Sequence, residues 1–408
     1  MAIGLSDGLQ QDRVRVDLDD GVETCVEQPL DGVGEEHGLT QIAAPVIGVQ
    51  SGAGFDLVCY DDAAAGLTVD MTKPGSGTGD ALGDLFAGIE GVVGSNFADT
   101  LRGDAAANWL YGGAGNDLLQ GRDGDDFLAG GAGGDQLDGG LGTDFADYSK
   151  DGGPVRADLV AWGGNTGTAA GDSYVSIEGL IGTAFDDVLL GSAIGNQLRG
   201  GAGNDWLYGR DGDDLLTGGS SADVLDGGAG SDAANYGDAA AGVIADLVLP
   251  GENAGDAAGD IFVSIESLVG SAFADSLRGD AGGNVLVGGG GDDWIYGRGG
   301  NDAIQGDGGN DVLFGGAGDD FVWTGSGNDQ IWFGVGDGKD TVNDFAGGAG
   351  AGDVLYLAKA LGVTSFAEVQ AKAAQVGAST VITFDAGTVI TLAGVTLTAL
   401  SADDFAFY

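Results

Sequence analysis

The chain has 408 residues, of which 64 are acidic and 14 are basic, so its formal net charge is −50. A charge of this size repels DNA, RNA and anionic lipid, which excludes nucleic acid as a partner. The 85 glycines do not recur every third residue and only five prolines are present, which excludes collagen. A hydrophobic fraction of 43% argues against a purely solvated chain.

Residues 1–50 form a degenerate N-terminal segment. Their first residues lack the charged and apolar regions of a classical signal peptide, and no apolar run long enough for a transmembrane helix occurs in the chain. Cys25 and Cys59 allow one disulfide at most, and whether they pair stays open. His37 is the only histidine, and one histidine cannot supply a three-ligand catalytic zinc site. Since no G-x-S-x-G motif occurs either, we expect no catalytic activity.

Residues 51–332 carry a nine-residue repeat of the form G-G-x-G-x-D-x-U-x, in which U is apolar. We count 19 frames in three runs, at residues 94–147, 182–235 and 270–332, and the runs are preceded by β-rich spacers at 60–93, 148–181 and 236–269. The eighth place of the frame is apolar in all 19, and the sixth is Asp in 16 and Asn in three. Runs and spacers recur every 88 residues, so the array consists of three super-repeats.

Such a frame predicts one short strand, x-U-x, followed by a turn in which glycine permits positive φ angles. Two frames then make one 18-residue coil, and stacked coils pair their strands in parallel about 4.8 Å apart. The predicted fold is therefore an all-β parallel solenoid with the eighth-place residues as a thin core. Stacking also places the sixth-place carboxylates in columns, where two neighbours repel by about 0.9 kcal/mol in water and about 3.5 kcal/mol at an effective dielectric of 20. Cations are needed to offset that repulsion.

Calcium is the expected cation, and several ions are expected per chain. Carboxylates and the carbonyls of glycine turns are hard oxygen donors, which suit Ca²⁺ with its six to eight ligands, whereas Mg²⁺ demands a tighter octahedron. The predicted carboxylate ligands are Asp117, Asp126, Asp135, Asp144, Asp205, Asp214, Asp223, Asp232, Asp293, Asp302, Asp311, Asp320 and Asp329. The predicted turn-glycine ligands are Gly113, Gly115, Gly131, Gly133, Gly201, Gly203, Gly228, Gly230, Gly289, Gly291, Gly316 and Gly318.

Six frames are expected to bind weakly or not at all. The opening frame of each run has Phe97, Phe185 or Phe273 at the fourth place, where a positive φ would strain it, and the following frame has Asn108, Asn196 or Asn284 at the sixth. Extra acidic residues in the turns, Asp123, Asp125, Asp211 and Asp213, are expected to add charge without ligating. Three arginines 88 residues apart, Arg122, Arg210 and Arg298, occupy the second place of their frames, and we expect them to form local salt bridges.

Aromatic pairs at the seventh and ninth places flank the inward residue and are expected to face outward. They are Trp109 with Tyr111, Trp206 with Tyr208 and Trp294 with Tyr296. Exposed pairs of this kind can bind a cell-surface glycan or a partner protein, and they can also pack across neighbouring strands.

Residues 333–408 depart from the repeat and are expected to form a small α+β cap. Ser365 and Glu368 have the spacing of a capping box at the start of a short helix. The segments STVITF and TVITLAGV then predict a β-hairpin, with Asp385 and Gly387 in its turn.

The stretches GGAGNDLLQ, GGAGNDWLY and GRDGDDLLT resemble the nonapeptide repeats of RTX proteins, and the resemblance covers about residues 51–408. It implies a right-handed parallel β-roll with Ca²⁺ held between turns of successive coils. The segment after residue 333 resembles the C-terminal segment of serralysin-type proteins, which implies an uncleaved signal read by the type I secretion machinery. The chain is then an extracellular protein that folds on Ca²⁺ after secretion. An adhesion or carbohydrate-binding module, or the repeat portion of a secreted enzyme such as a serralysin-type protease or a mannuronan epimerase, stays an alternative.

Overall fold

The computed structural model describes residues 14–16, 48–50, 55–73, 75–350 and 352–408. The chain divides into two compact units, Met1–Thr183 and Ala184–Tyr408. Cys25 and His37 lie outside the described residues, whereas Cys59 is buried. Among the residues that the structure describes, no helix is long and apolar enough to cross a membrane.

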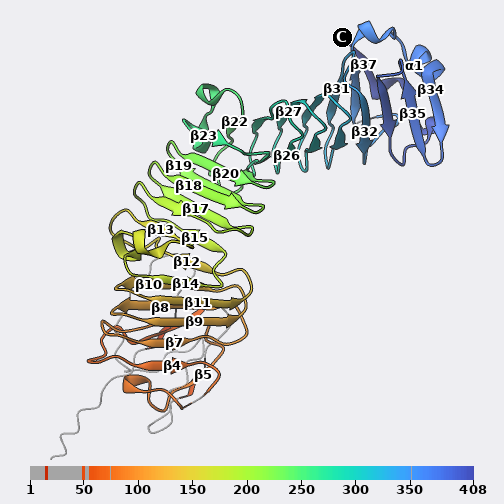
Figure 1. The fold of residues 1–408 in the computed structure, drawn as a ribbon. Coiled ribbons are helices and arrows are strands. Elements are labelled where there is room, and N and C mark those ends of the chain that lie inside the picture. The colour runs from red at the N-terminus through yellow and green to blue at the C-terminus, as the bar shows by residue number, and fades with distance from the viewer. Residues whose placement is uncertain (1–13, 17–47, 51–54, 74, 351) are drawn as a thin grey trace, which may run out of the picture. The chain divides into compact units, whose positions relative to one another are not determined.

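The first unit consists of short strands that are stacked coil upon coil (Figure 1). One sheet has the order β1-β3-β6-β8-β10-β12-β15, a second has the order β4-β7-β9-β11-β14, and β2 pairs with β5. All pairings between strands described in this unit are parallel except β1 with β3. The elements are β1 (Val14–Val16), β2 (Gly48–Gln50), β3 (Asp56–Cys59), β4 (Thr68–Asp70), η1 (Gly79–Ala81), β5 (Leu85–Ala87), β6 (Gly91–Val93), β7 (Thr100–Arg102), β8 (Trp109–Ala114), β9 (Leu118–Asp123), β10 (Phe127–Ala132), β11 (Gln136–Leu141), β12 (Phe145–Asp147), β13 (Arg156–Asp158), η2 (Trp162–Gly164), η3 (Gly167–Ala169), β14 (Ser173–Val175) and β15 (Gly179–Ile181).

The second unit repeats this arrangement and ends in the cap (Figure 1). Strands β17, β19, β21, β24, β26, β28, β30 and β32 pair in that order, β16-β18-β20-β23 form a second sheet, and β22-β25-β27-β29-β31-β33-β37 form a third. The elements are β16 (Val188–Leu190), β17 (Gln197–Ala202), β18 (Trp206–Asp211), β19 (Leu215–Ser220), β20 (Val224–Ala229), β21 (Ala233–Asn235), β22 (Ile244–Asp246), η4 (Pro250–Glu252), η5 (Gly255–Ala257), β23 (Ile261–Val263), β24 (Ser267–Val269), β25 (Ser276–Arg278), β26 (Val285–Val287), β27 (Trp294–Gly299), β28 (Ala303–Gln305), β29 (Val312–Ala317), β30 (Phe321–Trp323), β31 (Gln330–Phe333), β32 (Lys339–Asn343), β33 (Val354–Leu357), η6 (Lys359–Leu361), α1 (Phe366–Lys372), β34 (Ala373–Val376), β35 (Ser379–Thr383), β36 (Val389–Leu392), η7 (Leu397–Ala399), η8 (Ala402–Asp404) and β37 (Phe405–Phe407).

The register of the strands confirms the 18-residue coil. Leu110 pairs with Leu128, and Leu207 pairs with Leu225, so each residue lies beside the one 18 places later. All 19 eighth-place residues are at most 1% exposed. The core of each unit is thus the inward ladder of these residues, and the prediction of an all-β parallel β-roll is confirmed.

Many strands are longer than the three residues that the frame predicts. Each six-residue strand continues through the first three places of the next frame, as β8 does through Gly112, Gly113 and Ala114. These places are themselves in register between coils, with Gly113 beside Gly131. The pairing leaves only the fourth to sixth places to make the bend.

The cap contains the predicted helix and hairpin. β35 pairs with β36 in antiparallel fashion, and the Asp385 carboxylate accepts the N–H of Gly387 at the turn. The predicted capping box is wrong in one respect, because the Ser365 side chain makes no capping hydrogen bond to α1. Instead Glu368 accepts hydrogen bonds from the N–H and the hydroxyl of Thr364, so the carboxylate satisfies the residue before Ser365.

Replacing one core leucine should measure the strength of the inward ladder. Leu128 is fully buried, so Leu128→Ala should lower the free energy of unfolding by about 2–5 kcal/mol. Leu141 is 71% exposed in the same unit, and Leu141→Ala should have little effect. Urea unfolding of the calcium-loaded protein measures both variants, and equal losses would contradict the assignment of the core.

Candidate metal centre

Thirteen sixth-place aspartates form a continuous ladder through the coils of each unit. We call them the ladder aspartates: Asp117, Asp126, Asp135, Asp144, Asp205, Asp214, Asp223, Asp232, Asp293, Asp302, Asp311, Asp320 and Asp329. In each, Oδ1 accepts the backbone N–H of the sixth-place residue one coil earlier, at 2.7–2.9 Å. One carboxylate oxygen therefore fixes the bend of the preceding coil.

The other carboxylate oxygen, Oδ2, has no hydrogen-bond partner in any of the 13 ladder aspartates. Each of these side chains is at most 2% exposed. A buried oxygen with formal charge and no donor is costly, and orphaned groups of this kind are rare in proteins. Their recurrence at 13 equivalent positions indicates that a cation belongs beside them.

The first-place glycine of the frame marks the space that Oδ2 faces. A Cβ built on Gly200 would lie 2.2 Å from Oδ2 of Asp205 and 2.6 Å from the carbonyl oxygen of Gly218. A Cβ on Gly288 would similarly lie 2.3 Å from Oδ2 of Asp293 and 2.8 Å from the carbonyl oxygen of Gly306. We call this space, between the orphaned oxygen and the first-place carbonyl of the next coil, a cradle. Its oxygen donors fit Ca²⁺.

The backbone at the second place decides which frames keep a cradle. In all 13 frames with a ladder aspartate the second-place residue has a positive φ, between 67° and 113°. We call these 13 frames open, and the six frames expected to be weak closed. In five closed frames the second-place residue has no positive φ: Ser95, Asp104, Ser192, Ser271 and Asp280. There the N–H of the second-place residue donates to the sixth-place side chain, at 2.5–2.8 Å. In five of the six frames expected to be weak, the backbone itself thus satisfies the oxygen.

The spacers and the cap extend the ladder with acidic residues that the sequence reasoning missed. Asp172 and Asp260 accept the N–H of Asp135 and Asp223, at 2.8 and 2.9 Å. Three glutamates 88 residues apart, Glu90, Glu178 and Glu266, each directly precede a strand and accept the N–H of Asp56, Asp144 and Asp232. Asp340 and Asp353 continue the ladder into the cap. The shared segments GIEG, SIEG and SIES were the signal that could have identified the glutamates.

A tyrosine hydroxyl closes the ladder inside the spacers. Tyr148 donates to Oδ2 of Asp172 at 2.8 Å, and Tyr236 donates to Oδ2 of Asp260 at 2.7 Å. Both tyrosines are buried. The spacer carboxylates therefore keep the ladder contact through Oδ1 while a hydroxyl occupies the place that faces a cradle in the 13 open frames.

Burial also raises the pKa of the ladder aspartates from the ordinary value of 3.8. The pKa of Asp117 rises to about 6 and that of Asp205 to about 7, because burial outweighs the hydrogen bond from the preceding coil and nearby carboxylates add repulsion. The pKa of the other ladder aspartates is raised in the same direction. Without a cation these groups take up protons instead.

The glycines predicted as ligands lie in the same turns, but the structure brings other glycines to the cradle. The second-place glycines Gly113, Gly131, Gly201, Gly228, Gly289 and Gly316 all have positive φ, as do the fourth-place glycines except Gly133. The carbonyls beside Oδ2 belong to first-place glycines such as Gly218 and Gly306, which the sequence reasoning left out. Ligation by the predicted glycines stays a prediction.

Fifth-place side chains form a second, exposed ladder. Asp125 accepts the N–H of Thr143 at 2.8 Å, and Asp213 accepts that of Ser231 at 2.9 Å, in each case one coil later. These contacts give Asp125 and Asp213 a structural role at the rim of the turn. That these two residues, together with Asp123 and Asp211, add charge without ligating a metal ion stays a prediction.

The tryptophans of the three aromatic pairs face solvent, as the frame predicts. Trp109, Trp206 and Trp294 are 41%, 51% and 53% exposed. Trp109 is flanked by the rings of Phe55 and Phe127, with centroids 5.1 and 5.4 Å away, so much of its surface packs along the sheet. Trp206 contacts the ring of Tyr208 at 6.2 Å.

No group of three or more His, Cys, Asp or Glu side chains that could hold a metal ion occurs within the described ranges of the chain. A cradle instead combines one carboxylate oxygen with a backbone carbonyl oxygen. The 13 orphaned carboxylate oxygens, with the backbone carbonyls that lie beside several of them, are thus the candidate metal centre.

A protein-family model matches parts of the chain. The family described as RTX calcium-binding nonapeptide repeat (4 copies) matches residues 93–128, 111–146, 199–234, 269–304, 296–331 and 305–340. Among solved structures, the extracellular lipase LipA from Serratia marcescens is similar at 22% identity and a TM-score of 0.24. The match covers 55% of this chain and 40% of the lipase chain, so it spans less than half of the lipase. No curated protein sequence matches the chain.

Lowering the pH should stabilise the calcium-depleted protein. The pKa of the ladder aspartates is raised in the folded chain, so between about pH 4 and pH 7 the folded chain binds more protons than the unfolded chain. The free energy of unfolding therefore falls as the pH rises through this range. In chelator, far-ultraviolet circular dichroism should therefore show more strand signal at about pH 5 than at about pH 7.5.

The calcium-loaded protein is the control for this experiment. Protons compete with a metal ion for the same oxygens, so the thermal unfolding midpoint of the calcium-loaded protein should be lower at about pH 5 than at about pH 7.5. A calcium-depleted protein whose strand signal increases as the pH rises would contradict the raised pKa values.

Proposed function

Because the chain carries RTX calcium-binding nonapeptide repeats, we propose that it is a secreted protein whose β-roll folds when Ca²⁺ enters the cradles. The observation that supports this best is the set of 13 buried carboxylate oxygens without a donor. The chain supplies the oxygens in register and holds each by its Oδ1 hydrogen bond. A bound Ca²⁺ supplies the positive charge that the ladder lacks.

The charge of the chain makes such folding a switch. The chain has 14 basic and 64 acidic residues. Few basic side chains are therefore available to neutralise the columns of ladder carboxylates. The ion pairs that the structure describes engage Asp70, Asp158, Asp246 and Glu252 rather than ladder aspartates. Each occupied site adds about 2.7 kcal/mol to stability at a hundredfold excess of ligand over its dissociation constant. Coupled sites would make folding steep in calcium concentration.

We propose an extracellular location for the folded form. In a cytoplasm with little calcium, repulsion between the ladder carboxylates would keep the chain unfolded, which suits passage through a secretion channel. The C-terminal segment, residues 333–408, is the proposed contact with the type I secretion machinery, because it resembles the corresponding segment of serralysin-type proteins. Outside the cell, calcium is abundant enough to fill the cradles.

We also propose that this chain has no catalytic site of its own. Its acidic pairs are accounted for by the ladder contacts, and its sequence offers neither a zinc-protease motif nor a nucleophile elbow. The repeat portion of a secreted enzyme stays the alternative, since the same β-roll could serve as the export and folding module of a larger activity.

Titration with calcium followed by far-ultraviolet circular dichroism tests the folding switch. Strand signal should be largely absent in chelator and should appear over a narrow range of Ca²⁺ concentration. Mg²⁺ should act far more weakly, because it dehydrates reluctantly and demands a tighter octahedron. In Asp205→Asn the amide oxygen can still accept the N–H of Asp187 while the charge at the cradle is removed. This variant should bind about one Ca²⁺ fewer and need more calcium to fold.

Asp213→Asn is the matched control, because it removes the same charge from an exposed fifth-place side chain. It should bind as many ions as the unmodified protein. β-structure already complete in chelator would defeat the proposed switch, and equal metal content in the two variants would defeat the assignment of the cradle.

A second candidate function is recognition of a glycan through the outward tryptophans. The observation that favours it is the half-exposed ring of Trp206, whose neighbour Tyr208 lies on the same strand. A ring of this kind can stack on a sugar face. On a glycan array, Trp206→Ala should then lose binding that the unmodified protein shows, whereas identical profiles would leave packing as the role of the pair.

A further inference from the structure

Three arginines occupy a backbone conformation that an L residue rarely adopts. Arg122, Arg210 and Arg298 take the second place of their frames with φ angles of 92°, 86° and 75°, where most open frames have glycine. Such a φ strains any residue with a Cβ. An arginine at all three equivalent positions therefore requires a contact that offsets the strain.

The contact is the same at each arginine. Nη1 of Arg298 donates to the carbonyl oxygen of Gly279 at 2.6 Å, and Arg122 and Arg210 donate in the same way to Gly103 and Gly191. The acceptors are the first-place glycines of the three Asn frames, one coil earlier. Each guanidinium thus lies against the kind of carbonyl that faces an orphaned oxygen in an open frame.

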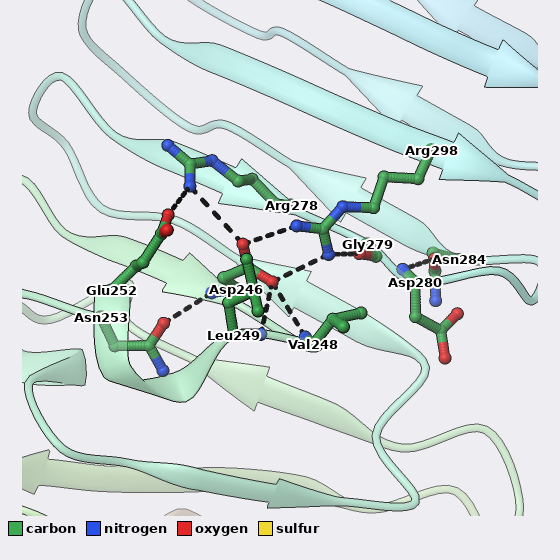
Figure 2. A network of polar contacts seen from close by, with 10 residues as sticks. All are labelled: Asp246, Val248, Leu249, Glu252, Asn253, Arg278, Gly279, Asp280, Asn284 and Arg298. Carbon is green, nitrogen blue, oxygen red and sulfur yellow. Dashed lines mark hydrogen bonds and ion pairs between the residues drawn. The ribbon is translucent and has the colours of Figure 1, made fainter.

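The guanidinium of Arg298 also forms a hydrogen-bonded ion pair with a buried carboxylate of the spacer. It donates to Oδ1 and Oδ2 of Asp246 at 2.8 and 2.6 Å, and Asp246 is fully buried (Figure 2). Arg278 approaches the same carboxylate at 3.5 Å and pairs with Glu252 at 2.7 Å. In Figure 2 the two guanidinium groups reach Asp246 from the strands that follow the spacer. Two-pronged contacts of this type are strong and directional.

The first unit holds an independent copy of this arrangement. Nη2 of Arg122 lies 2.9 Å from Oδ1 of Asp70, which is 5% exposed, while Nη1 contacts the carbonyl of Gly103. Asp70 and Asp246 occupy the same position of the 88-residue unit, two super-repeats apart. The geometry thus recurs in two of the three super-repeats.

We infer that Arg122 and Arg298 are built-in cations. Each guanidinium donates to the two kinds of oxygen that meet in an open cradle, a buried carboxylate and a first-place glycine carbonyl. It thereby closes the junction between a spacer and its run of frames without a metal ion. The inference goes beyond the proposed function, because this junction would hold whether or not calcium occupies the cradles.

The pKa values of Asp70 and Asp246 differ from those of the ladder aspartates, because a guanidinium lies beside each of the first two. Burial raises the pKa of Asp70, but hydrogen bonds from Thr72, Arg122 and Lys73 outweigh it and lower the value to about 2. At Asp246 burial is likewise outweighed, by the Arg298 guanidinium and two backbone N–H groups, and the pKa is lowered. The pKa values of the ladder aspartates, which are similarly buried but have no cation, shift the other way.

Hydrogen exchange in chelator, followed by mass spectrometry, tests the inference on the full chain. Strands β22 and β25, which pair at this junction, should stay protected in the unmodified protein without calcium. In Arg298→Gly, which suits the positive φ, they should exchange on the order of a hundredfold faster, because Asp246 is left buried without its main partner. Added Ca²⁺ should restore protection, because the variant leaves a carboxylate facing a glycine carbonyl.

Asp307→Gly is the matched control. Asp307 also takes a second place with positive φ, 67°, in the next frame of the same unit, so this variant relieves the same backbone strain without removing a guanidinium. It should leave the exchange of β22 and β25 unchanged.

Three results would overturn the inference: equal exchange of Arg298→Gly and the unmodified protein in chelator, unprotected β22 and β25 in the unmodified protein, or no recovery of the variant with calcium. Protection of the open-frame strand β29 in chelator would count against the proposed folding switch alone, so the two failures are distinguishable. Arg298→Lys keeps the charge but not the two-pronged contact, and an exchange rate between those of glycine and arginine supports the geometry.

Discussion

The structure depends on stacking negative carboxylates in a place that water does not reach. A ladder aspartate such as Asp205 uses one oxygen to hold the bend of the preceding coil and leaves the other buried without a donor. The hydrogen bond through Oδ1 fixes the side chain, and the pairing of the coils keeps water away from Oδ2. The side chain therefore cannot expose Oδ2 to water without breaking the hydrogen bond. The cost of the ladder is therefore built into the fold, and a cation from outside is the compensation that the geometry admits.

The chain controls where that cation is required. A positive φ at the second place, as at Gly201, turns the local N–H away and leaves a cradle. A second-place residue such as Asp104 lets its own N–H satisfy the sixth-place side chain. In the spacers the hydroxyl of Tyr148 serves the same purpose, and at the spacer junctions a guanidinium takes the place of the ion. Under the proposed function, each unit thus contains levels that need a metal ion and levels that do not.

Periodicity predicted the fold because a nine-residue pattern with an apolar eighth place has few other solutions. The inward ladder followed from it, whereas the C-terminal hairpin was predicted separately from the segments STVITF and TVITLAGV. The ladder contacts of Glu178 and Asp172 were not predictable in the same way, because they lie outside the frames and come into register only when the spacer folds over the last coil. The Oδ2 orientation of Asp205 and the position of the Gly218 carbonyl depend on the turn geometry, which a residue pattern does not specify.

The most direct measurement is a crystal structure of the protein grown with calcium, in which anomalous scattering locates the ions. The account predicts ions beside the orphaned Oδ2 atoms of the 13 ladder aspartates. It predicts none beside Asp99 or Asn108, where the N–H of Ser95 or Asp104 already donates. Water molecules alone in the cradles, or ions distributed equally over open and closed frames, would contradict it.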